Sequence, residues 1–344
     1  GEAARRRASG EPHVLRLAMP SGGETTVRDL LRGEIRFDLA EIDDQVLVKS
    51  DGFPTYHLAN VVDDHLMEIS HVIRAEEWIS SLPKHVRLYE AFGWEPPVFC
   101  HLPLLRNADR SKISKRKNPT SLMHYRRAGI LSEAMRNYLA LMGWTMPDER
   151  DQFTLEEFVA EIDLERISLG GPVFDREKLA WLNGRWIRTL STQDLLRRLR
   201  SEQLSDAYLA RVLPLMHERM EALTDLFDRG GYFFGGELEY GETARGRLVA
   251  KDLTPPQTAK GLRQLLEEWL DPVLDWTPET IEDALRGFCE AKGWSPKQLF
   301  MPVRVAVTGS TATPPLFDTM AVLGKEVCRR RLRRATEVLR TLKP

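Results

Sequence analysis

The sequence lacks several features that mark particular classes of protein. It has three cysteines among 344 residues and no CxxC pair, so it indicates neither a zinc knuckle nor a disulfide framework. No apolar run approaches the ~20 residues of a membrane span. The first residues are polar and basic, with no apolar segment of a signal peptide behind them. We therefore predict a cytoplasmic protein that contacts no membrane and holds no zinc.

An excess of charge of one sign is also lacking. Lys and Arg number 49 against 51 Asp and Glu, which gives a formal net charge of −2. This balance excludes a polycation that attracts nucleic acid through its total charge, although a basic cluster on one face can still bind it. The 42% hydrophobic and 29% charged residues are ordinary for a globular protein, and the length predicts two to three domains.

Three parts of the chain differ in their sequence pattern. Residues 13–49 alternate in the manner of short strands, and Gly22-Gly23 and the following Asp51-Gly52 indicate turns. Between residues 50 and 105, helical segments alternate with apolar strands at 69–74 and 98–102, and a helix is expected over 78–92. Such alternation predicts a parallel sheet that binds its ligand at the carboxyl ends of the strands. From residue 118 onward the pattern is helical, so the predicted fold is α/β followed by all-α.

Two helix starts support the helical half. Thr154 and Glu157 have the spacing of a capping box. Thr277 and Pro278 supply a cap and a first helical residue, and Gly293 lies just past the expected end. Between them runs one apolar face at helical spacing: Ile281, Ala284, Leu285, Phe288 and Cys289. We therefore expect this cysteine to lie in the core and not to react.

The most specific local signal is the basic run at residues 110–117, where five cations alternate with small serines. It directly follows an expected strand end at 102–105, where an α/β sheet places its ligand. Lys112 and Lys115 are spaced to converge on one polyanion, and Ser114 adds a hydroxyl donor. The alternative interpretation is a solvated basic loop or a general nucleic-acid patch.

The segment Lys-Ile-Ser-Lys-Arg at 112–116 resembles the second signature of class I aminoacyl-tRNA synthetases. Blocks at 50–65, 72–78, 169–175 and 323–326 are similar to those of bacterial-type glutamyl-tRNA synthetases, in unbroken order from about His13 to Leu342. The resemblance implies a ligase that joins L-glutamate to tRNA-Glu through glutamyl-adenylate. It also implies ATP with Mg²⁺ as cofactor, no metal caged by the protein, and a monomer. In the family, Lys112, Ser114 and Lys115 belong to the catalytic loop over the triphosphate.

The same resemblance assigns residues to the two small substrates. The glutamate pocket would comprise Tyr56, Asn60 and Arg74, since a side-chain carboxylate calls for a planar, bidentate cation. The ATP site would comprise Glu77, Trp78, Leu105, Ile113 and Lys115. Two alternatives concern single residues: Arg74 could be a surface arginine paired with Glu76 or Glu77, and Trp78 could belong to the core.

The helical half is expected to read the anticodon, because unstacked RNA bases are bound by stacking and by hydrogen bonds to their edges. The positions that match the family's anticodon contacts are Arg219, Arg304, Thr313, Pro314 and Leu316. Arg219 is associated with strict decoding of glutamate. The basic segment 325–334 is either a solvated helix face or a phosphate contact.

The resemblance also implies five segments. They are the remainder of an acceptor-binding insertion (1–49), the second half of a class I Rossmann-like catalytic domain (50–118), a stem-contact region (119–190) and two helical anticodon-binding domains (191–243 and 244–344). The first class I signature, a His-x-Gly-His-like element, is absent from the sequence, so we expect no glutamyl-adenylate from residues 1–344 alone. Two alternatives are a non-catalytic tRNA-binding fragment or paralogue and a short glutamyl-queuosine-type paralogue. The latter lacks a helical half.

Replacement of the second lysine of the basic run tests its assignment. In the complete enzyme, Lys115→Ala should lower the rate of ATP–pyrophosphate exchange by on the order of 10²–10³, because a positioned donor to the triphosphate is lost. Binding of tRNA-Glu, measured by filter binding, should change far less. Comparable losses in both measurements would contradict the assignment.

Overall fold

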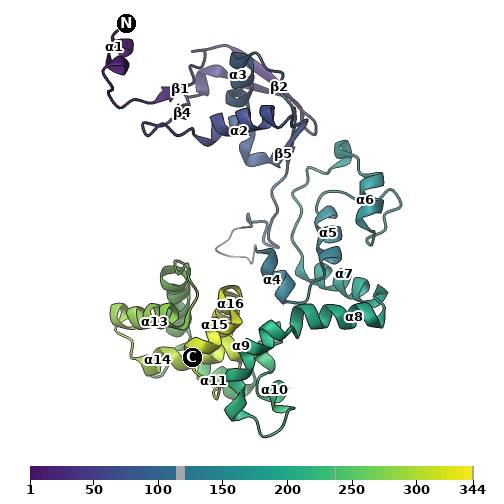
Figure 1. The fold of residues 1–344 in the computed structure, drawn as a ribbon, viewed down its shortest axis with the longest axis vertical. Coiled ribbons are helices and arrows are strands. Elements are labelled where there is room, and N and C mark those ends of the chain that lie inside the picture. The colour runs from purple at the N-terminus through teal and green to yellow at the C-terminus, as the bar shows by residue number, and fades with distance from the viewer. Residues whose placement is uncertain (114–120, 237, 343–344) are drawn as a thin grey trace. The chain divides into compact units, whose positions relative to one another are not determined.

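The computed structural model describes residues 1–113, 121–236 and 238–342. These described residues divide into two compact units, one within 1–113 and 136–178 and one within 121–135 and 179–342 (Figure 1). The predicted catalytic residues Ser114 and Lys115 lie outside the described residues. None of the described helices has the length and apolar character to cross a membrane.

The first unit contains a four-stranded sheet in the order β3-β2-β6-β5. Its strands are β2 (Glu24–Asp29), β3 (Gly33–Asp38), β5 (His71–Ala75) and β6 (Val98–Leu102). β5 and β6 are parallel, as the helix–strand alternation predicted, and β2 joins β6 in parallel at Asp29 and Phe99. The strands at 24–38 therefore share one sheet with the α/β strands. A separate pair is formed by β1 (Leu15–Arg16) and β4 (Val46–Val48).

Helices pack against this sheet. α2 (Tyr56–Leu66) and α3 (Leu82–Phe92) enclose with it a core that contains Val61, Leu88 and Phe99. The helix expected from residue 78 begins instead as the 3₁₀ turn η2 (Glu76–Ser81), and the α-helix starts next to Pro83, which cannot donate a backbone hydrogen bond. Further along the chain lie α5 (Ser132–Ala140) and α6 (Leu155–Glu161), and α6 begins with the predicted capping box.

The second unit is helical. Its elements are α4 (Leu122–Arg127), α7 (Arg176–Thr189), α8 (Thr192–Arg198), α9 (Asp206–Met216), α10 (Asp225–Asp228), α11 (Glu242–Leu248), α12 (Pro255–Gln264), α13 (Pro278–Lys292), α14 (Pro296–Thr308), α15 (Leu316–Leu323) and α16 (Lys325–Thr341). One apolar core runs from Val212 to Leu339. The predicted face of α13 is buried, and Gly293 ends that helix in the left-handed conformation.

The basic helix α16 directs part of its charge inward. Arg331 is 2% exposed, and its terminal nitrogens donate to the carbonyl oxygens of Val307 at 2.6 Å and Tyr232 at 2.8 Å. Arg329 pairs with Asp271 and is also half-buried. These two arginines tie α16 to its neighbours within the unit, so they belong neither to a solvated face nor to a phosphate contact.

Two helical glycines make room for indole rings, and one of them provides a test of the packing. A Cβ atom on Gly261 of α12 would lie 2.4 Å from Trp294, so Gly261→Ala should destabilise the protein by about 1–3 kcal/mol despite the better helix propensity of alanine. Gly246 of α11 has open space, and Gly246→Ala should stabilise by up to about 1 kcal/mol. Thermal denaturation measures both changes, and equal transition temperatures for the two variants would contradict this account.

Candidate functional site

Arg74 is the centre of a polar cluster at the carboxyl end of the parallel strands. Its Nε donates to Nε2 of His101 on β6 at 3.0 Å, and its Nη1 lies 3.0 Å from Nδ1 of His85 on α3. Nε2 of His85 in turn lies 2.9 Å from Nδ1 of His57 on α2. The sheet and both helices thus contribute imidazole rings to the surroundings of one guanidinium.

The hydrogen bonds fix the proton on each ring. A guanidinium can only donate, so Nε2 of His101 and Nδ1 of His85 must be acceptors. The proton of His101 therefore sits on Nδ1, which lies 2.7 Å from the Asp29 carboxylate. The proton of His85 sits on Nε2 and is donated to His57. One set of tautomers satisfies every contact, and all three rings are then neutral.

Burial favours the same neutral state. Desolvation lowers the pKa of His85 to about 3, and the charge of Arg74 acts in the same direction. Desolvation is also the main cause that lowers the pKa of His57 and of His101, although Asp29 opposes it at His101. Protonation of any of these rings would place a second cation beside the guanidinium.

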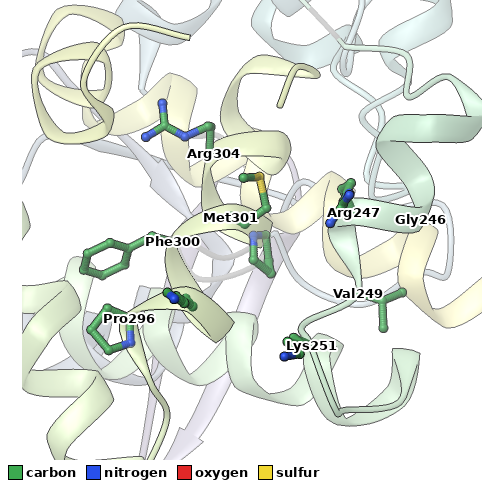
Figure 2. A pocket seen from close by; sticks show the side chains of 10 residues that line it. Gly246, Arg247, Val249, Lys251, Pro296, Phe300, Met301 and Arg304 are labelled. Atoms are coloured by element: carbon green, nitrogen blue, oxygen red, sulfur yellow. The ribbon is translucent and has the colours of Figure 1, made fainter. Parts of the chain in front are cut away.

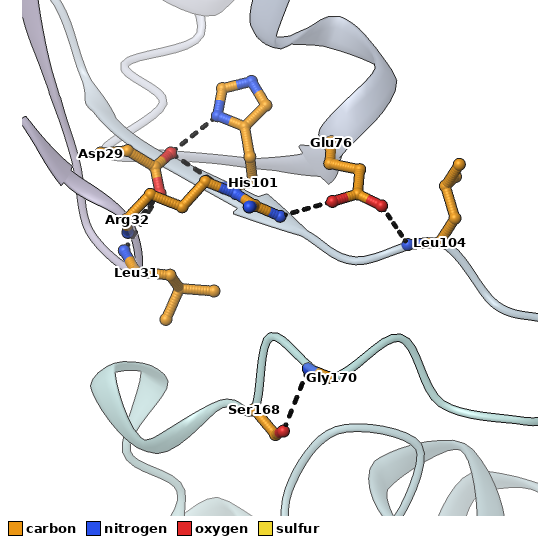
Figure 3. A network of polar contacts seen from close by, with 8 residues as sticks. All are labelled: Asp29, Leu31, Arg32, Glu76, His101, Leu104, Ser168 and Gly170. Atoms are coloured by element: carbon orange, nitrogen blue, oxygen red, sulfur yellow. Dashed lines mark hydrogen bonds and ion pairs between the residues drawn. The ribbon is translucent and has the colours of Figure 1, made fainter. Parts of the chain in front are cut away.

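Figure 3 shows how a polar network joins the strand ends beside this cluster. Asp29 at the end of β2 is 1% exposed, and its carboxylate accepts from the backbone and ring of His101 and from the amides of the turn after β2. Arg32 of that turn pairs with Glu76 at 2.7 Å, and Glu76 accepts from the amide of Leu104 at 3.3 Å. The network fixes the ends of β2, β5 and β6 relative to one another.

The acidic residues near Arg74 have other partners. Glu76 pairs with Arg32, and Glu77 forms an ion pair with Lys112. The alternative of a surface arginine paired with one of these two glutamates is therefore wrong. Nη2 of Arg74 is instead buried and has no acceptor within the described chain.

The other residues of the predicted glutamate pocket lie beside Arg74. The Tyr56 ring packs on Trp78 with centroids 4.7 Å apart, and the guanidinium lies 6.0 Å from the Trp78 ring. Burial lowers the pKa of Arg74, whereas Tyr56 and Asp64 oppose that shift. Tyr56, Asn60 and Asp64 follow at four-residue spacing along α2, so they share a face. Oδ1 of Asn60 is a buried acceptor with no donor among the described residues.

A pocket of about 660 Å³ brings Arg74 together with the start of the basic run. Leu105, Lys112 and Ile113 line it beside Arg74, and apolar side chains such as Trp144 line it as well. The amide of Ile113 donates to the carbonyl of Leu105 at 3.2 Å, which sets these two positions side by side. The predicted grouping of Arg74 with Lys112 is thus present, whereas Ser114 and Lys115 fall outside the structure's described part.

Asp63, Asp64 and His65 form a run of ionisable residues in α2. The His65 ring stacks on Trp94 with centroids 3.8 Å apart and planes 6° apart. Within the described ranges, no group of three His, Cys, Asp or Glu side chains has the arrangement of a metal site. His65 therefore has a packing role.

Sequence reasoning missed the residues that hold Arg74: His57, His85, His101 and Asp29. One signal was present, because a histidine in the middle of the apolar strand 98–102 needs a buried hydrogen-bond partner. The partners themselves lie 27 and 72 residues away, and a single sequence does not reveal such pairings.

A second pocket, of about 610 Å³, lies in the helical unit. Figure 2 shows Arg247 and Lys251 on one side of it and Phe300, Met301 and Arg304 on the other. This surface combines cations with an aromatic ring and apolar side chains. Such a combination suits a stacked, negatively charged nucleotide strand.

Arg304 connects this pocket to the predicted anticodon strip. Its Nη1 donates to the hydroxyl of Thr313 and, at 2.7 Å, to the carbonyl of Pro314. Thr313, Pro314 and Leu316 are themselves buried. Burial lowers the pKa of Arg304, Tyr232 opposes the shift, and the exposed Arg219 adds to it. Arg304 thus lines the pocket, and Thr313 and Pro314 accept its hydrogen bonds.

Both halves of the chain match known protein families. Residues 1–181 match the family described as tRNA synthetases class I (E and Q), catalytic domain, and residues 186–336 match the anticodon binding domain. The glutamate–tRNA ligase of Marinomonas sp. (strain MWYL1) is 46% identical over 332 residues, which cover 96% of this chain and 66% of that protein. A glutamate–tRNA ligase of Thermus thermophilus is 50% identical over 347 residues, which cover 97% and 71%.

A solved structure is similar as well. The glutamate tRNA ligase of Elizabethkingia meningosepticum CCUG26117, in complex with its amino acid, is 32% identical with a TM-score of 0.54, and the match covers 99% of this chain and 71% of that one. The chain spans about two thirds of the length of the curated relatives it matches. The predicted fold class, α/β followed by helical, is confirmed. The chain belongs to the glutamate–tRNA ligase family of class I tRNA synthetases.

Proposed function

We propose that the polypeptide containing this chain ligates L-glutamate to tRNA-Glu with ATP and Mg²⁺. The α-carboxylate of glutamate attacks the α-phosphorus of ATP and pyrophosphate leaves, which forms glutamyl-adenylate. A terminal ribose hydroxyl of the tRNA then attacks the activated carbonyl, and AMP leaves. We further propose that the enzyme acts as a monomer in the cytoplasm, apart from membranes.

The observation that carries this proposal is the unpaired edge of the Arg74 guanidinium. Nη2 is buried beside the pocket and has no acceptor in the described chain, and a buried cation without an anion is costly. A carboxylate would supply the missing acceptor and charge, in the planar geometry that a guanidinium prefers. Asn60 offers the complementary feature, a buried acceptor for an ammonium or amide donor. Tyr56 adds an aromatic ring that packs on Trp78.

The other side of the pocket suits a nucleotide. Glu77 can accept hydrogen bonds from ribose hydroxyls, Trp78 offers an aromatic surface, and the backbone at Leu105 and Ile113 can read the adenine edge. The Lys112 ammonium would neutralise phosphate oxygens, as would Lys115 together with the Ser114 hydroxyl. Mg²⁺ would arrive with the phosphates and need only oxygen ligands from ATP and water. Lys112 lines the pocket and forms an ion pair with Glu77.

The helical unit supplies a surface for the tRNA. Arg247, Lys251, Lys297 and Arg304 gather around the apolar floor of the second pocket. Cations there would contact phosphates, and Phe300 could stack on a base. We propose that Arg304 and Arg219 contact the anticodon loop directly, and that Thr313, Pro314 and Leu316 shape the strip behind them.

The function can be tested at Arg74. Arg74→Lys and Arg74→Gln should raise the KM for glutamate in ATP–pyrophosphate exchange by roughly 10- to 100-fold, because the bidentate contact to a charged group is lost. The KM for ATP should stay within about threefold. The matched control is Arg87→Gln on the surface of α3, which removes only an exposed pair with Glu90.

Two results would contradict the proposal. An unchanged KM for glutamate in both Arg74 variants would show that Arg74 does not bind the substrate carboxylate. Tight binding of tRNA-Glu by the unmodified polypeptide without any glutamate-dependent exchange would favour the non-catalytic tRNA-binding alternative.

A further inference from the structure

We propose that His85 and His101 are positioning residues that hold the Arg74 guanidinium without an ion-pair partner, so that its free edge selects an anionic side chain. The inference rests on the proposed function, in which that side chain belongs to glutamate. It concerns residues outside the glutamate, nucleotide and anticodon sets.

The geometry fixes the guanidinium plane. His101 on β6 accepts from Nε and His85 on α3 accepts from Nη1, each at 3.0 Å. Two acceptors on different elements determine both the position and the rotation of a planar group. His101 and His85 are 0% and 1% exposed, so neither ring has space to move away. The remaining nitrogen, Nη2, is left for a ligand.

The chemistry of the acceptors matters as much as their placement. A carboxylate in either position would also accept from the guanidinium, but it would cancel the charge that attracts an anionic substrate. A neutral imidazole gives a hydrogen bond without a countercharge. Glu76 and Glu77 are engaged by Arg32 and Lys112. The charge of Asp64 on α2 acts on Arg74 through space, and no ion pair joins the two side chains in the described part of the chain. The arrangement therefore leaves the positive charge for the ligand.

Asp29 completes the arrangement from the far side of His101. Its carboxylate accepts from Nδ1 of His101 at 2.7 Å and from the His101 amide at 3.0 Å. The same carboxylate accepts from the amides of Leu31 and Arg32 at 3.1 Å each. It thus holds the proton of His101 on Nδ1 and keeps Nε2 available to Arg74. A histidine present only to fill the core would need no fixed tautomer.

Three variants of His85 separate the effect of where the acceptor lies from the effect of a negative charge beside Arg74. His85→Asn keeps a neutral acceptor close to the place of Nδ1, His85→Asp has nearly the same shape but adds a carboxylate, and His85→Leu removes the acceptor. We expect the dissociation constant for L-glutamate, measured by calorimetry, to change less than about threefold in His85→Asn. It should rise at least about 30-fold in His85→Asp and at least about tenfold in His85→Leu. The dissociation constant for ATP should change less than about threefold in all three.

The ratio of the affinities for L-glutamate and L-glutamine is a measurement that a loss of packing at His85 would not change by itself. This ratio should collapse in His85→Asp, because the guanidinium is neutralised, and should persist in His85→Asn. Equal losses of glutamate affinity in the Asn and Asp variants, or an unchanged affinity in the Leu variant, would overturn the inference.

A second measurement needs no variant and no ligand. Long-range ¹H–¹⁵N correlations of histidine-labelled protein at pH 7 should show the proton on Nδ1 in His101 and on Nε2 in His85. The opposite tautomers, or a protonated ring, would overturn the inference. If these tautomers are found while Arg74→Gln leaves glutamate binding unchanged, the positioning of Arg74 stands and the proposed function fails.

Discussion

The first unit is organised around a partly buried guanidinium that forms no ion pair with a carboxylate of the described residues. Removing a cation from water is unfavourable unless it is hydrogen-bonded and offset by nearby charge. Here the hydrogen bonds come from neutral rings, and the nearest carboxylate in the chain of contacts, Asp29, acts through His101. The order of strands, the position of α3 and the turn after β2 all serve to bring these groups to Arg74. The unfavourable feature of the site is therefore its positive charge and not a steric clash. Binding of an anionic ligand would relieve it.

The second unit contains an instructive contrast. Arg331 is also buried without an acidic partner in the described chain, yet both of its terminal nitrogens donate to backbone carbonyl oxygens, with distances of 2.6 Å to Val307 and 2.7 Å to Gly235. Carbonyl dipoles compensate part of its charge and use the side chain as a structural link. Among the described residues, two imidazole rings accept from Arg74, and its Nη2 keeps an open edge beside a pocket. An arginine thus links structural elements in the second unit and is a candidate binding group in the first.

Much of this organisation could be predicted from the sequence. The strand at 98–102, the capping box at Thr154, the N-cap at Thr277 and the apolar face of α13 follow from local periodicity and capping chemistry, and all are present. The strand-end rule placed the basic run with Lys112 at a ligand site, and the family resemblance assigned Arg74 to the same site; both residues line one pocket.

Other features depend on contacts between distant residues. The pairing of β2 with β6 and the imidazole rings around Arg74 leave little local trace, because hydrogen bonds between residues far apart in sequence are set by topology. The burial of Arg331 was hidden for a similar reason, since in sequence it is one of several arginines in a basic helix. The 3₁₀ start at Glu76 reflects local geometry that apolar periodicity does not resolve.

The link between Asp29 and His101 also bears on how the pocket comes into being. These residues are 72 positions apart, and β2 meets β6 in parallel at the same place. Pairings across such long loops form slowly, because the entropy of loop closure must be overcome first. Arg74 can therefore acquire its final orientation only after the sheet has closed. Affinity for the amino acid would then serve as a late marker of correct assembly, and a nascent or misfolded chain would be unable to sequester it.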